Sequence, residues 1–98
     1  MKKYCSAGVF KLDIEQVGFD ELKKIAKEWS SDKCFHELIV RKVSDKDYGI
    51  QFVYISDDLS TDKIVEYEKK LNSKYKVSVD YCNVYNTEGI IVMKAFKE

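Results

Sequence analysis

The 98-residue chain contains no proline and only four glycines. Flexible linkers and low-complexity tails are often rich in proline and glycine, so the scarcity of these two residues excludes such segments. No run approaches the ~18 consecutive apolar residues that a membrane-spanning helix needs. A chain of this length supports one hydrophobic core rather than two. We therefore expect residues 1–98 to form a single domain that does not interact with a membrane.

Arginine is nearly absent, since the basic residues are 16 lysines and one arginine, Arg41. The 17 basic residues are balanced by 17 acidic ones. The chain therefore lacks the overall positive field that draws proteins to nucleic acids. Arginine is also the residue that contacts phosphates and guanine edges with two hydrogen bonds, a geometry that lysine reproduces poorly. Both features disfavour a nucleic acid as the partner.

Cysteine and histidine are scarce as well, with three cysteines and one histidine. The odd number and wide spacing of the cysteines fit reduced thiols, and no signal-peptide apolar region is complete, so we expect a cytoplasmic protein. Cys34 and His36 would face the same side of a strand. A zinc site needs about four ligands, and the sequence offers no second closely spaced pair. We interpret the two residues as a buried thiol and a strand-end imidazole, and we predict no metal and no cofactor.

Hydrophobic periodicity and turn signals predict five strands and two helices. The strands are expected at residues 4–15, 34–43, 49–56, 76–85 and 89–96, and the helices at about 19–30 and 61–74. Hairpin partners lie side by side and crossovers are right-handed, which gives the strand order 5-4-1-3-2. The predicted fold class is α+β. Its architecture is a ferredoxin-like βαββαβ sandwich with an additional C-terminal strand, an antiparallel sheet and two helices on one face.

Two helices cover only one face of such a sheet, so the other face is left for water or a partner. If Val43 pairs with Ile50, the side chains beneath the helices are aliphatic: Leu38, Val40, Val53 and Ile55. The open face then carries a mixed set that is typical of a contact surface: Phe35, Glu37, Ile39, Arg41, Ile50, Phe52 and Tyr54. A slip of one residue would reverse the assignment for one of the two strands.

Tyrosine is abundant, with seven copies. Its ring gives a large, stiff contact area with a polar tip, which suits interfaces, although tyrosines also cover the rim of a small core. Tyr81 and Tyr85 lie on one side of the strand predicted at 76–85. The residues predicted to bind a partner are Phe35, Arg41, Ile50, Phe52, Tyr54, Tyr81 and Tyr85.

A first alternative function comes from residues 47–55, DYGIQFVYI. They resemble the aromatic strand of RNA-recognition motif proteins, because Gly49, Phe52 and Val53 stand where that family has a glycine, an aromatic and an aliphatic residue. Ile50 stands in place of that family's first stacking aromatic. The resemblance implies an RNA- or single-stranded-DNA-binding domain whose strand aromatics stack on bases.

A second alternative is a metal-dependent nuclease. The segment LDI at residues 12–14 resembles the end of the first strand in small CRISPR-associated ferredoxin-like nucleases. The resemblance implies that Asp13, with Asp57 or Asp58, would hold a divalent cation. We interpret Asp57 and Asp58 instead as a polar loop before a helix, where negative charge is favoured.

The sequence as a whole favours a non-enzymatic protein-interaction module that acts through its open sheet face or its C-terminal hairpin. The partner would be another protein, a second copy of the chain, or both, and we expect a homodimer because the edge strands offer unpaired backbone groups. Small inhibitors, immunity-type proteins and accessory subunits work in this way. A phage- or plasmid-encoded anti-defence protein such as an anti-CRISPR is one instance.

Overall fold

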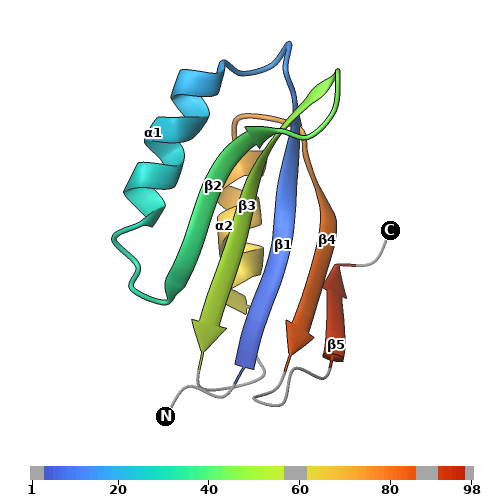
Figure 1. Cartoon of the computed structure of the whole chain (residues 1–98). Helices are drawn as coiled ribbons and strands as arrows, with labels where there is room; N and C mark the ends of the chain where they lie inside the picture. Colours follow the sequence, from blue (N-terminus) through green and yellow to red (C-terminus); the bar gives the residue numbers. More distant parts are fainter. Residues whose placement is uncertain (1–3, 57–61, 86–90, 97–98) are drawn as a thin grey trace.

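The structure is a computed structural model that describes residues 4–56, 62–85 and 91–96, with side chains described for residues 5–55 and 62–79. It contains β1 (Tyr4–Asp13), α1 (Phe19–Trp29), β2 (Phe35–Lys42), β3 (Asp47–Ser56), α2 (Asp62–Asn72), β4 (Val77–Tyr85) and β5 (Ile91–Phe96). The sheet is antiparallel in the order β2-β3-β1-β4-β5, as the sequence predicted. Both helices lie on one face of it (Figure 1), which confirms the α+β class.

The helices form where apolar residues recur at helical spacing. Buried positions follow one another at three- and four-residue intervals in α1 (Leu22, Ala26 and Trp29) and in α2 (Ile64, Tyr67 and Leu71). Acidic residues in the first turn and lysines in the last turn of each helix complement the helix dipole. Neither of these two helices, the ones within the described residues, is long and apolar enough to cross a membrane.

The core lies between the helices and the sheet. Phe10 and Phe52 have no exposed surface, and their rings stack with centroids 4.9 Å apart. The Trp29 ring of α1 meets Phe10 edge-on at 5.6 Å. Leu12 and Ile50 complete the buried centre of β1 and β3. Aromatic pairs at these separations add to the free energy gained from burial, so this cluster anchors α1 to the central strands.

The register of the β2–β3 hairpin differs from the predicted one. Ile50 pairs with Val40 and not with Val43, whose N–H donates to the Asp47 carbonyl at 3.0 Å. This difference moves each β3 side chain to the opposite face of the sheet from the predicted one. Ile50, Phe52 and Tyr54 therefore face the helices and are buried. Their predicted placement on the open face is wrong. Apolar residues occupy both faces of β3, and the pattern alone could not decide which face lies inside.

The predicted position of Phe35 is also wrong, for a different reason. Two residues of β2, Phe35 and Glu37, oppose consecutive residues of β3, Tyr54 and Val53. The additional residue, His36, forms a β-bulge, which bends the strand and re-aims its side chains. The Phe35 ring therefore lies on the helix side, 4.9 Å from the Tyr54 ring, while Glu37 pairs opposite Val53.

Gly49 is required by a close approach of side chains over β3. A Cβ atom at this position would lie 2.7 Å from Val9 Cγ1 and 2.8 Å from Val43 Cγ1. We expect Gly49→Ala to lower the free energy of unfolding by about 1–3 kcal/mol, because both valines must move. Gly18→Ala is the control. Apart from the chain neighbours of Gly18, no atom lies within 4 Å of its Cβ position, so we expect only the smaller cost of alanine at the N-cap of α1. Urea unfolding measures both variants, and equal losses would contradict the close approach.

Candidate interaction surface

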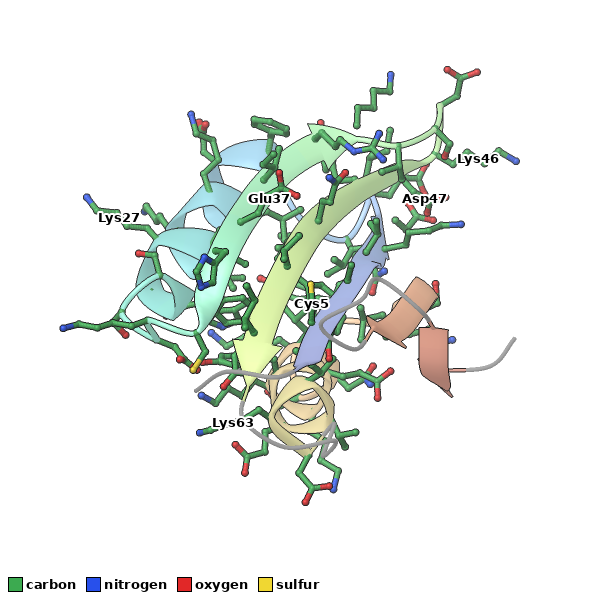
Figure 2. All side chains as sticks on the ribbon, turned by 60° about the horizontal axis from the view of Figure 1, so that its bottom comes forward. Cys5, Lys27, Glu37, Lys46, Asp47 and Lys63 are labelled. Carbon is green, nitrogen blue, oxygen red and sulfur yellow. The ribbon has the colours of Figure 1, made fainter. Side chains whose placement is uncertain are left out.

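The face of β1, β2 and β3 that points away from the helices is covered by neither of the described helices (Figure 1). In Figure 2, Cys5 and Glu37 mark β1 and β2 within this sheet. We call this surface the open face. Its apolar members are half-buried except for Ile39, which is 42% exposed. The open face consists of Cys5, Ala7, Val9, Lys11, Glu37, Ile39, Arg41, Gln51, Val53 and Ile55.

A polar row crosses the open face at Gln51. The Nε of Arg41 donates to Gln51 Oε1 at 2.9 Å, and Gln51 Nε2 donates to Glu37 Oε2 at 3.1 Å. The Gln51 amide therefore lies between the Arg41 guanidinium and the Glu37 carboxylate, which both come from β2. Because these bonds run between neighbouring strands, they fix the side chains in place, which lowers the entropy cost of contacting a partner.

Beside this row the open face has a shallow hollow of about 240 Å³, whose lining includes Ala7, Val9 and Val53. Pockets for small organic ligands are usually larger, at roughly 300–1,000 Å³. Cys5 pairs opposite Ile55 on the same face, and burial raises the pKa of its thiol. At neutral pH this thiol is protonated, so it behaves as a small apolar group and not as a nucleophile.

Only one of the residues predicted to bind a partner has a described side chain on the open face. That residue is Arg41, which is exposed. The side chains of Tyr81 and Tyr85 lie outside the described ones, although their backbones pair with Val9 and Cys5 of β1. The other predicted residues belong to the core: Phe35, Ile50, Phe52 and Tyr54. Phe52 and Tyr54 therefore present no free ring for a base to stack on.

Cys34 and His36 do not share a side of one strand. Cys34 precedes β2 and packs against the core, whereas His36 is exposed at the bulge. Among the residues with described side chains, no three of the types that bind metals gather at one point. Asp13 is exposed and accepts a hydrogen bond from the Glu15 N–H at 2.8 Å. The predicted acids Asp57 and Asp58 lie outside the described residues.

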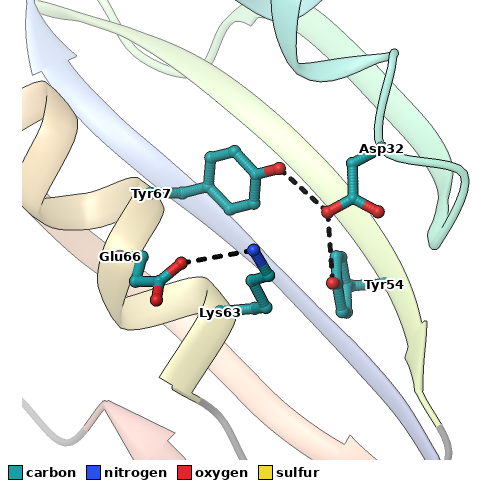
Figure 3. Close-up of polar contacts among 5 residues, drawn as sticks. All are labelled: Asp32, Tyr54, Lys63, Glu66 and Tyr67. Carbon is teal, nitrogen blue, oxygen red and sulfur yellow. Dashed lines mark hydrogen bonds and ion pairs between the residues drawn. The ribbon is translucent and has the colours of Figure 1, made fainter.

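A polar cluster that the sequence did not reveal joins three segments at the other side of the sheet. Asp32, in the turn between α1 and β2, accepts hydrogen bonds on Oδ2 from the hydroxyls of Tyr67 at 2.9 Å and Tyr54 at 3.1 Å (Figure 3). Its Oδ1 accepts the Cys34 N–H at 3.0 Å. One carboxylate thus ties this turn to β3 and α2.

The charge of Asp32 is favoured by these contacts. Burial by itself would raise the pKa of the carboxyl, but the hydrogen bonds from Cys34, Tyr67 and Tyr54, with the charge of Lys63, hold the pKa below its usual range. Burial and the neighbouring carboxylate raise the pKa of both tyrosine hydroxyls well above the ordinary value. The hydroxyls therefore stay protonated and donate to the carboxylate, an arrangement suited to holding structure together rather than to proton transfer near neutral pH.

Comparison of the chain with protein-family models, with curated proteins and with solved structures finds no match. The surface geometry is therefore what bears on function.

Proposed function

We propose that the chain is a non-enzymatic protein-interaction module, a ferredoxin-like sandwich extended by β5, whose open face binds a second copy of itself. Inhibitors, immunity-type proteins and accessory subunits, anti-defence proteins among them, belong to this functional class. The observation that carries the proposal is the composition of the open face. Apolar Val9, Ile39, Val53 and Ile55 surround a fixed polar row in a sheet whose helices cover only the opposite side.

The occupant is a second copy because the polar row is self-complementary. A two-fold contact brings the same patch of both copies together, so each charged residue can meet the opposite charge of its partner. Glu37 and Arg41 lie on either side of Gln51 on the open face. In a face-to-face dimer, the Glu37 of one copy meets the Arg41 of the other, while the valines and isoleucines exclude water between them.

Light scattering tests this self-association. We expect the wild-type chain to have twice the mass of one chain at about 50 µM, at both low and high salt, because an apolar contact is little screened. Val53→Lys places an unpaired charge in the contact from both copies, so we expect dimerisation to weaken by more than about tenfold.

Val65→Lys is the matched control, since Val65 is half-buried on α2, away from the open face. It should leave the dimer intact. A wild-type chain that is monomeric at 50 µM would contradict the proposal. Equal dissociation by the two substitutions would contradict it too, provided that thermal unfolding shows both variants to be folded.

A further inference from the structure

A groove of about 550 Å³ runs between α1 and β2, at the edge of the sheet. Its apolar surface comes from Phe19 and Ala26 on the helix and from Leu38, Ile39 and Val40 on the strand. Phe19 is 36% exposed, although phenylalanine is among the residues most often buried. The volume falls within the range that admits several side chains of a ligand.

The strand beside this groove has one free edge. β2 is the first strand in the sheet order, and β3 is its only neighbour within the described residues. The Val43–Asp47 hydrogen bond shows which β2 residues pair with β3, because bonded pairs alternate along an antiparallel ladder. Glu37, Ile39 and Arg41 turn their backbone groups toward β3. The backbone N–H and C=O of Leu38, Val40 and Lys42 therefore point outward.

The same residues of a bound segment would contact both the groove and the free edge. Side chains directly opposite each other on paired strands point to the same face of the sheet. A segment that pairs antiparallel with β2 would therefore place the residues opposite Leu38 and Val40 into the groove. These residues would also make the backbone hydrogen bonds, so one extended segment satisfies both features at once.

The charge around the groove is positive. Lys23 and Lys27 of α1 line it, and none of its lining residues is acidic. Figure 2 shows Lys27 extending from α1, beside the strand that carries Glu37. Lys23 Nζ lies 5.9 Å from the centre of the Phe19 ring, so the amine stands directly beside the apolar surface. A segment that fills the groove meets an apolar floor flanked by two ammonium groups.

From this juxtaposition we propose that β2 and the α1–β2 groove bind an extended acidic peptide segment of another protein, which adds to the sheet as an antiparallel strand. Its groove-facing side chains are an apolar residue flanked by acidic ones. The apolar residue packs on Leu38, Val40 and Phe19, and the acidic ones pair with Lys23 and Lys27. This binding uses the edge and the helix side of β2, whereas self-association uses the open face, and Ile39 borders both surfaces.

A second copy of the chain does not fit this edge. If two β2 strands paired about a two-fold axis, their α1 helices would lie side by side on the same face. Lys23 and Lys27 of both copies would then approach one another, and like charges at close range oppose association. An acidic segment would avoid this repulsion. We therefore infer that the partner at this edge is another protein.

An NMR titration with a defined probe tests the proposal. The probe is a capped seven-residue peptide in which threonine alternates with glutamate, leucine and glutamate. We expect the amide signals of Leu38, Val40 and Lys42 to shift on binding. Reversing the groove charges with Lys23→Glu and Lys27→Glu should weaken binding by about tenfold or more and favour the peptide that carries lysine in place of glutamate.

Two controls separate this mode from general attraction. The double variant Lys24→Glu and Lys69→Glu changes the same charge at exposed helix positions outside the groove, and it should bind the acidic peptide almost as wild type does. N-methylation of the glutamates and leucine removes the amides that pair with β2 and should abolish binding. N-methylation of the intervening threonines should leave it.

Three results would overturn the proposal: no shift at millimolar peptide, equal affinity for the acidic and the basic peptide, or equal effects of the two methylation patterns. None of them bears on the dimer mass, so failure here is distinguishable from failure of self-association. A groove variant that merely misfolds would bind neither the acidic nor the basic peptide, whereas a folded variant should bind the basic peptide better than the acidic one.

Discussion

Phe52→Ala is expected to remove about 3–5 kcal/mol from the free energy of unfolding, a large part of the stability of a domain this size. The Phe52 side chain is fully buried and stacks on Phe10 with 4.9 Å between ring centres. Truncation therefore leaves a cavity between the two central strands and the helices. Chemical denaturation of both proteins at low micromolar concentration, where self-association contributes little, measures the loss.

The neighbouring residue provides the control. Val53 follows Phe52 on β3 but lies on the open face and is only half-buried. We expect Val53→Ala to cost less than about 1.5 kcal/mol, because little packing is lost. A loss below 1 kcal/mol for Phe52→Ala, with a larger one for Val53→Ala, would show that the opposite face of β3 is buried. It would also restore Phe52 as a candidate for stacking on a nucleic-acid base.

Asp32→Ala is expected to destabilise the fold by about 2–3 kcal/mol. Two tyrosine hydroxyls, those of Tyr54 and Tyr67, would lose their acceptor while remaining largely buried. Asp32→Asn keeps an oxygen that can accept a hydrogen bond and should therefore cost less. Urea unfolding at pH 7 compares the two variants. Equal stability of wild type and Asp32→Ala would mean that the cluster does not hold the turn to β3 and α2.

The same carboxylate predicts how stability depends on pH. The pKa of Asp32 is lower in the folded state than in the unfolded chain, where it is about 3.9. Its contribution is therefore complete above that value and is lost as the pH falls through the folded pKa. The stability difference between wild type and Asp32→Asn should narrow in acid. A constant difference from pH 7 to pH 2 would contradict the hydrogen-bonded carboxylate.

The tyrosines give the opposite dependence at alkaline pH. Their pKa values are raised in the folded state, so the unfolded chain releases these protons first, near pH 10. Stability should therefore fall as the pH rises above that value.

The open face could be anticipated from the sequence only in part. That two helices leave one sheet face uncovered follows from the element order, and Glu37, Ile39 and Arg41 were placed on that face correctly. The prediction of which β3 side chains lie on the open face is wrong, because β3 carries large apolar residues on both sides. A pattern of period two identifies the buried face only when the other face is polar.

The sequence by itself determined the elements and their order. Apolar residues at helical and strand spacing defined the helices and strands, and short hairpins with right-handed crossovers left one simple strand order, which the sheet has. These features depend on neighbours along the chain. Only the tertiary structure decided the hairpin register, the bulge at His36 and the meeting of Asp32 with Tyr54 and Tyr67. Each of these depends on which side chains pack between sheet and helices, a competition among distant residues that local spacing does not encode.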